Sequence, residues 1–373
     1  MNRSVLLIGL VSLLNDAASE MIAPLMPIFL TVTLGGAPAW VGIIEGAADM
    51  AASLLKLYAG RLSDLTGRRK PWMVGGYLLV SITRPPLAFA TAPWMVLALR
   101  VVDRVGKGVR TSPRDALLAE SVAAKNHGFA FGFHRAMDHA GAFLGALIAW
   151  ALLHQGMPIR DIFLWSAVPA LVACAFAFGV PETRVAPSAS VPLPPLPRSL
   201  RGVLLAVGIL GLGQIGDAFL LLKAGEAGVP LESLPLLWMA LHAVKSLASL
   251  GAGGLSDRVG RRPVILAGWC VRAVIYGMLA MAGSAEALAA LFVVYGLYHG
   301  LTEGAEKALV AEMSTTASAF GWYHLTTGVV VLPAGILVGW LWTVAGAPVA
   351  FAYGTMMVLI AVVALTLAPR PAL

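Results

Sequence analysis

The stretch GRLSDLTGRR at residues 60–69 decides the fold, because the chain contains it twice. Its second copy is GGLSDRVGRR at residues 253–262, and the two copies share the pattern G-x-L-S-D-x-x-G-R-R. A second pair of segments recurs at nearly the same offset, with DALLAE at 115–120 and KALVAE at 307–312. Segments that recur in the same order at near-equal spacing predict two halves with the same topology.

The composition around these copies is that of a membrane protein. Of the 373 residues, 59% are hydrophobic and 12% are charged, whereas a soluble domain has about 25% charged residues. Apolar stretches of about 20 residues recur along the chain, and each is long enough to cross roughly 30 Å of hydrocarbon. We therefore expect an all-α membrane protein with twelve transmembrane helices. The expected spans lie near residues 4–33, 37–59, 71–91, 94–121, 128–154, 158–179, 200–224, 231–252, 263–282, 286–313, 317–343 and 347–368.

The charged residues outside the spans indicate the topology. They are mostly basic and follow even-numbered spans, as at Arg68 and Arg69 and at Arg198 and Arg201. By the positive-inside rule, both termini and the segment 181–200 are expected in the cytoplasm. The net charge of +7 is thus explained by topology, and nucleic-acid binding is not expected.

The first span is expected to remain part of the protein. The apolar region of a cleaved signal peptide would not carry Asn15, Asp16 and Glu20. The two cysteines, Cys174 and Cys270, lie inside expected spans. They suit packing in a membrane helix and do not predict a disulfide framework or a zinc site, so no cofactor is expected.

The segment PETRVAPSASVPLPPLPRSL at 181–200 breaks the apolar pattern. Such a proline-rich stretch is typical of a semi-extended linker. It predicts an N-terminal six-helix bundle over residues 1–180, a cytoplasmic linker over 181–200 and a C-terminal six-helix bundle over 201–373.

The doubled loop resembles the signature loop of the major facilitator superfamily, and the resemblance extends over the full chain. It implies two pseudo-symmetric six-helix bundles with loops that act as structural and gating elements. In this family the loop glycine lets helices approach closely, the aspartate caps a helix or pairs with a base, and the arginines hold the cytoplasmic face. The positions that match are Gly60, Asp64, Gly67, Arg68 and Arg69, and Gly253, Asp257, Gly260, Arg261 and Arg262.

Span 5 resembles the antiporter motif of the same family. The stretch GFHRAMDHAGAFLGALIA places Gly132, Gly141 and Gly145 at the motif's spacing, with Ala146 where the motif has proline. The resemblance favours export by antiport. Small residues at this spacing also suit close packing of helices.

Span 4 is unusually ionic for a membrane helix. At about 100° per residue, its bases between Arg100 and Arg114 fall within an arc of roughly 120°. Each charge facing the lipid centre would cost about 2.5–3.5 kcal/mol, so this face must meet water or opposite charges. The family resemblance implies that the first and fourth spans of each half line a central cavity.

Span 10 carries carboxylates where span 4, its repeat partner, carries bases. Glu303 and Glu306 stand in the region that corresponds to Arg110 and Arg114. We interpret these four as an inner gate between the halves. The alternative is a local pair between Glu303 and Lys307 on one helix turn.

Further polar residues inside the spans are candidates for a substrate cavity and for proton coupling, because carboxylates and histidines change protonation most readily. Asp16, Glu20, His134 and Asp138 are the first candidates for the proton. The full cavity set is Asp16, Glu20, Asp49, Arg104, Lys107, His134, Asp138, Asp217, His242 and His299.

These features predict a secondary active transporter that moves a small polar or charged solute across an inner (plasma) membrane, with protons as the coupling partner. We expect it to work as a monomer. Two alternatives stay open: divalent metal-ion efflux, for which His134, Asp138 and His139 offer suitable ligand types, and a lipid-handling or non-transporting member. The sequence contains no H-E-x-x-H or G-x-S-x-G motif, so no enzyme is expected.

Overall fold

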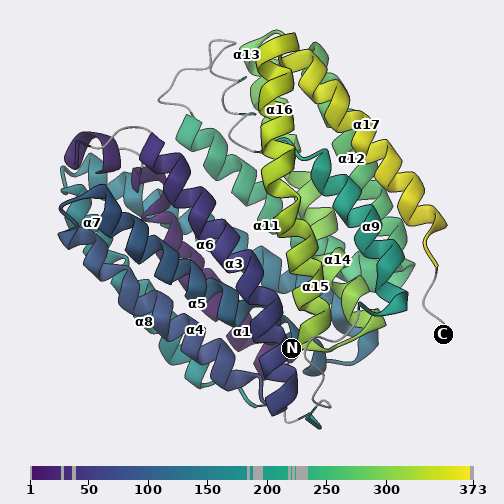
Figure 1. Ribbon diagram of the computed structural model, residues 1–373, viewed down its shortest axis with the longest axis horizontal. Helices are drawn as coiled ribbons and strands as arrows, with labels where there is room; N and C mark the ends of the chain where they lie inside the picture. The colour runs from purple at the N-terminus through teal and green to yellow at the C-terminus, as the bar shows by residue number, and fades with distance from the viewer. Residues whose placement is uncertain are drawn as a thin grey trace. The chain divides into compact units, whose positions relative to one another are not determined.

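A computed structural model describes residues 2–26, 29–35, 39–182, 185–187, 196–216, 220, 223 and 234–369. The side chains of some residues in 31–50, of residues 234 and 235 and of residue 332 lie outside this description. The secondary structure of the described part is helical (Figure 1).

The first helix, α1, is capped by Asn2, whose side chain accepts a hydrogen bond from the Ser4 amide. The helices of the first part of the chain are α1 Arg3–Glu20, η1 Ala23–Leu25, η2 Phe29–Thr33, α3 Ala39–Thr66, α4 Lys70–Thr83, η3 Pro85–Phe89, α5 Pro93–Glu120, η4 Ala124–Asn126, α6 His127–His154, α7 Ile159–Trp165 and α8 Ala167–Phe178.

In the second part of the chain, two pairs of helices each fall inside a single expected span: α13 and α14, which Tyr295 separates, and α15 and α16, which Val330 separates. The series is α9 Arg198–Leu212, α11 Leu234–Val259, α12 Arg261–Met281, α13 Ala285–Val294, α14 Gly296–Met313, α15 Ala317–Val329, α16 Val331–Ala345 and α17 Ala347–Leu367.

Together these helices follow the expected spans, and the expectation of an all-α membrane protein is confirmed. Eight helical segments of the described residues are long and apolar enough to cross a membrane. Among the other expected spans, α3 and α5 have 28 residues each but carry several charges. The helices α4 and α9 have 14 and 15 residues, which is short for a crossing of about 20 residues.

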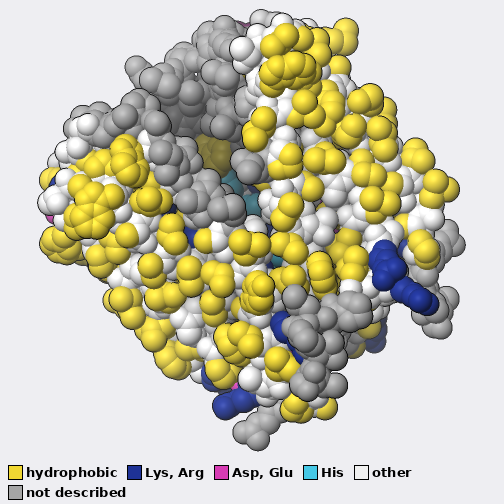
Figure 2. Space-filling view, in the orientation of Figure 1, with side chains coloured by type: hydrophobic (Ala, Val, Ile, Leu, Met, Phe, Trp, Pro, Cys, Tyr) yellow, Lys and Arg dark blue, Asp and Glu magenta, His cyan; other side chains and the backbone are white. Residues whose placement is uncertain are grey.

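Large apolar side chains lie on the outer surface of the helices. Trp94, Leu247, Val274 and Met281 are all more than half exposed, and Figure 2 shows many hydrophobic side chains and few charged ones on the visible face. Soluble proteins rarely expose such continuous apolar surface. In a membrane these side chains contact lipid, so their exposure does not carry the free-energy cost of hydrating apolar surface.

The chain divides into two compact units, and each unit consists of segments that are not contiguous in the sequence. Unit 1 comprises Met1–Ala123, Met137–Pro194 and Thr315–Leu325. Unit 2 comprises Ala124–Ala136, Pro195–Ser314 and Thr326–Leu373. The start of α6 therefore groups with unit 2, and the start of α15 groups with unit 1. The bundle boundaries at residues 180 and 201 stay a prediction.

Two glycines of span 5 bring α6 into direct contact with α1 inside unit 1. A Cβ atom at Gly141 would lie 2.1 Å from the carbonyl oxygen of Leu13, and one at Gly145 would lie 2.2 Å from that of Ala17. Real Cβ atoms do not come so close to an oxygen. The helix-packing interpretation of this spacing therefore accounts for both glycines.

Candidate functional site

The first signature loop holds the N-terminus of a distant helix. In unit 1, Asp64 near the end of α3 accepts hydrogen bonds from the Ala317 amide at 3.0 Å and the Ser318 amide at 2.8 Å, and from the Ser318 hydroxyl. These are the first residues of α15. A carboxylate at this position satisfies free amide groups and is favoured by the helix dipole.

Asp64 also pairs with a base. The Arg69 guanidinium lies 2.6 Å from Asp64 and 2.9 Å from Glu120, the last residue of α5. Burial by itself would lower the pKa of Arg69, but the hydrogen bond to Glu120 and the charge of Asp64 outweigh it and raise that pKa above its ordinary value. Arg69 thus stays charged and ties α5 to the loop.

The second signature loop repeats this arrangement in unit 2. Asp257 accepts hydrogen bonds from the Gly128 amide at 2.8 Å and the Phe129 amide at 2.7 Å, at the start of α6. Arg261 lies 3.2 Å from Asp257 and 3.4 Å from Glu312. The recurrence of glutamate at the end of DALLAE and KALVAE therefore has a structural reason, because each glutamate binds a loop arginine.

The two loops do not use equivalent arginines. Sequence alignment of the repeats pairs Arg69 with Arg262, yet it is Arg261 that binds the second aspartate. Arg262 donates instead to the Ala368 carbonyl at 2.7 Å, and Arg68 lies 3.9 Å from Glu182.

The loop glycines allow the close approaches and turns that the resemblance implied. A Cβ at Gly60 would lie 2.5 Å from the Ala317 carbonyl oxygen, and one at Gly253 would lie 2.6 Å from that of Gly128. Gly67 and Gly260 have φ of 62° and 96°, a region that favours glycine.

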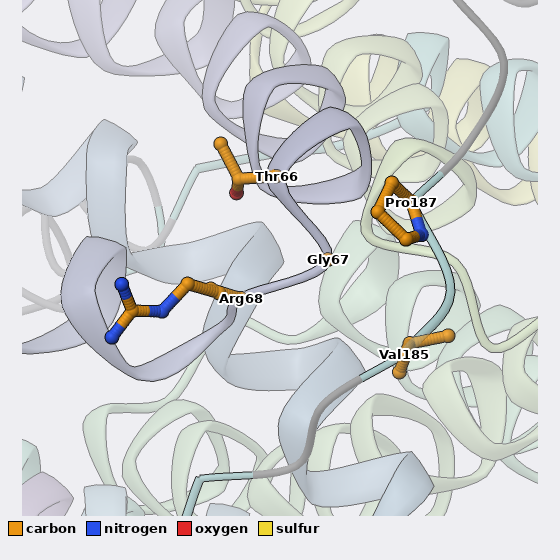
Figure 3. Close-up of a pocket in the computed structure, with 5 residues that line it drawn as sticks. All are labelled: Thr66, Gly67, Arg68, Val185 and Pro187. Carbon is orange, nitrogen blue, oxygen red and sulfur yellow. The ribbon is translucent and has the colours of Figure 1, made fainter.

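A small hollow lies beside the first loop. It is lined by Thr66, Gly67, Arg68, Val185 and Pro187 (Figure 3). The Val185 amide donates to the Gly67 carbonyl at 3.2 Å, so the start of the linker binds the loop directly. This hollow adjoins the loop and is separate from the charges inside the helices.

Unit 1 gathers several of the predicted cavity residues around α1. Asp16 and Glu20 are half-buried there. Lys107 and Arg110 of α5 and Asp138 of α6 lie close enough to interact with the charge of Asp16. Glu20 likewise lies close enough to interact with the charges of Arg100, Arg104 and Lys107. The ionic face expected on span 4 thus meets carboxylates of span 1.

Arg84 belongs to this cluster and was missed by the sequence interpretation. It follows α4, is buried, and lies 3.4 Å from Asp103. It also donates to Asn15 and Ser19 of α1. Arg84 lies inside the expected span 71–91, directly before Pro85 and Pro86, and no repeated motif or shared helix face pointed to it.

The four predicted gate residues have partners within their own units. In unit 1, Arg110 lies over the Tyr77 ring at 4.1 Å, and Arg114 binds Asp115 at 2.9 Å. In unit 2, Glu306 accepts from the Trp269 indole at 2.9 Å.

Glu303 pairs with His299 at 2.8 Å and Arg135 at 3.4 Å. The gate between these four residues stays a prediction.

The remaining predicted residues are more scattered. His134 is fully buried on α6, and His242 of α11 packs against the Trp238 ring at 5.1 Å. The side chain of Asp49 and the whole of Asp217 lie outside the described residues.

A second buried arginine binds a helix end in unit 2. Arg272 of α12 donates to the Gly213 carbonyl at 3.1 Å, where α9 ends, and to the Tyr298 hydroxyl at 2.9 Å. The Ile215 amide donates to the Tyr276 hydroxyl at 3.2 Å. These contacts satisfy backbone groups that the end of α9 leaves free.

Apolar helices, a doubled loop that caps helix ends and an ionic cluster among buried helices define an integral multi-pass membrane protein built on an internal repeat. The Major Facilitator Superfamily profile matches residues 8–241, and the chain belongs to that family. The resemblance inferred from the two loops is confirmed.

Relatives and solved structures agree with this assignment. An uncharacterized MFS-type transporter of Methanocaldococcus jannaschii is 30% identical over 96% of this chain and 93% of that protein. Multidrug resistance protein MdtH of Cronobacter sakazakii is 32% identical, over 35% of this chain and 33% of that protein. The proton:xylose symporter XylE shares the fold with a TM-score of 0.79 at 13% identity, covering 98% of this chain and 95% of that one.

Proposed function

We propose that this chain is a secondary active transporter that exports a small polar or charged solute across an inner (plasma) membrane in exchange for protons. It works by alternating access, as a monomer with both termini in the cytoplasm. The observation that carries the proposal is the half-buried Asp16, with Lys107, Arg110 and Asp138 around it. An ionisable group inside a membrane helix is costly and is typically functional.

Neighbouring bases and a neighbouring acid act on Asp16 in opposite directions. Burial and the charge of Asp138 favour the protonated carboxyl, whereas Arg110 and Lys107 favour the ionised one. A carboxyl held between such influences can exchange its proton when its surroundings change. This is the property that a proton-coupled transport cycle requires.

The helix-capping loops supply the gating part of the proposal. Asp64 and Asp257 each accept hydrogen bonds from the first amides of a helix that is more than 100 residues away in the sequence. Breaking and remaking two such sets of bonds gives a two-state element, which alternating access needs. Arg110, Arg114, Glu303 and Glu306 are proposed as the accompanying inner gate.

Export is supported by the partial match to a multidrug resistance protein, whereas the packing of α6 against α1 already explains two of the span-5 glycines. The fold alone does not identify the substrate, because a proton:xylose symporter and a human organic anion transporter share it. The organic anion transporter matches with a TM-score of 0.76 at 17% identity, over 97% of this chain and 99% of that one. No observation favours divalent metal-ion efflux or lipid handling over solute export.

The test uses purified protein in liposomes that contain a pH-sensitive dye. Ethidium, benzoate, glutamate, xylose and Mn²⁺ are added in turn, and solute-driven proton movement is recorded. We expect at least one solute to move protons with wild-type protein, and Asp16→Asn to abolish that movement.

The matched control is Asp161→Asn, which changes an exposed carboxylate at the start of α7 and should behave as wild type. Proton movement at the wild-type rate in Asp16→Asn would refute the role given to Asp16.

A further inference from the structure

Arg84 makes a set of directed contacts with one turn of α1. Its guanidinium donates to the Asn15 backbone carbonyl at 3.1 Å, to the Asn15 side-chain oxygen at 3.2 Å and to the Ser19 hydroxyl at 2.9 Å. Its Nε lies 3.4 Å from a carboxylate oxygen of Asp103. Arg84, at the end of α4, therefore contacts both α1 and α5, and these contacts fix its position.

These contacts determine which way the Asn15 amide points. A guanidinium has only donors, so the amide atom that faces Arg84 must be the oxygen Oδ1. The amide nitrogen Nδ2 then points to the Asp16 carboxylate, to which it donates at 2.8 Å. Rotating the amide by half a turn would place donors against Arg84 and an oxygen against a carboxylate, and both contacts would be repulsive.

Other charged groups also act on Asp16, and their effects are distinct from that of the Asn15 hydrogen bond. Lys107 and Arg110 face Asp16 from α5, and Asp138 faces it from α6. Glu20 lies on the same helix, and Arg84 itself lies at the end of α4. The helix α8, which also packs against α1, carries only Cys174 as a titratable residue.

The charges on α5 and α6 remain in place when Asn15 is changed. The hydrogen bond from Nδ2 is thus a separate contribution. A donor that faces a carboxylate favours its ionised form, and here Arg84 prevents the donor from turning into an acceptor.

We propose that Arg84 and Asn15 are positioning residues for Asp16: Arg84 orients the Asn15 amide so that Asp16 always meets a hydrogen-bond donor. This inference rests on the proposed role of Asp16 as the proton carrier. In that role the pair makes proton release from Asp16 easier, because the ionised carboxylate is met by a ready donor.

The test reads Asp16 itself and needs no solute. The infrared C=O band of protonated carboxyls is titrated with pH on the full-length protein in liposomes, and the part that disappears in Asp16→Asn is assigned to Asp16. We expect Asn15→Ala to shift the midpoint of that band toward alkaline pH by about one pH unit or more. Arg84→Gln should shift it in the same direction, because the amide regains freedom and because a positive charge that acts on Asp16 is removed.

Ser19→Ala is the matched control, since it removes one Arg84 contact and leaves the Asn15 amide in place. It should keep the wild-type midpoint. Arg84→Lys retains a donor for the Asn15 oxygen and should restore most of the midpoint, which a general loss of folding would not do.

An unchanged midpoint in Asn15→Ala would overturn the inference, whatever Arg84→Gln shows, because a shift in Arg84→Gln alone follows from the lost charge. Its failure is distinct from that of the proposed function: Asp16→Asn can still abolish solute-driven proton movement while the Asn15 variant titrates as wild type. In that case Asp16 carries the proton without the help of Arg84.

Discussion

Replacing Asp64 by alanine should loosen the start of α15. The carboxylate accepts from the amides of Ala317 and Ser318, at 3.0 and 2.8 Å, and alanine offers these groups no acceptor. The variant also removes one of the two carboxylates that hold the buried Arg69.

The size of the effect follows from these contacts. Loss of a helix N-cap costs about 0.5–2 kcal/mol, and a charged acceptor that serves two amides belongs at the upper end. Breaking a buried ion pair on one side costs about 3–5 kcal/mol, but Arg69 keeps Glu120. The local opening of α15 depends on the cap alone. A cost of about 2 kcal/mol corresponds to roughly thirtyfold faster opening, at 1.36 kcal/mol per factor of ten.

Hydrogen exchange measured by mass spectrometry checks this. Peptides that contain Ala317 and Ser318 should exchange roughly thirtyfold faster in Asp64→Ala than in wild type. Asp257→Ala is the matched control, because it uncaps Gly128 and Phe129 instead. If exchange at the start of α15 is unchanged in Asp64→Ala, while the control speeds exchange at the start of α6, the capping argument is wrong.

Three further predictions concern helix packing, the proposed gate and the topology. Gly141→Val should prevent folding, seen as loss of the monodisperse peak in size-exclusion chromatography, because its side chain would begin 2.1 Å from a carbonyl oxygen of α1; Gly75→Ala, which meets nothing within 4 Å, should elute as wild type. Arg114→Glu should impair transport, and adding Glu306→Arg should restore part of it; no rescue with both proteins folded would exclude the proposed gate. A cysteine at Ser188, which lies outside the described residues, should resist labelling by an impermeant reagent in intact cells, and labelling from outside would contradict the cytoplasmic linker.

The sequence by itself determined the fold class and the family. Twelve apolar spans and the doubled loop gave the fold class and the family, because hydrophobicity and repetition are properties of the linear chain. The angular position of the bases on α5 was also predictable, since a helix turns by about 100° per residue. That angle put the bases on one face of the helix, and the structure shows bases of this face close enough to interact with Asp16 and Glu20 of α1.

Only the tertiary structure decided the partner of each charge. Asp64 caps a helix that starts 253 residues later, and Arg261 rather than Arg262 binds the second loop aspartate. Arg84 joins Asn15 and Asp103 from two other helices. A hydrogen bond needs donor and acceptor about 3 Å apart and well aligned, and that geometry depends on how neighbouring helices pack. Spacing along one helix fixes the direction of a side chain, but it does not fix what the side chain meets.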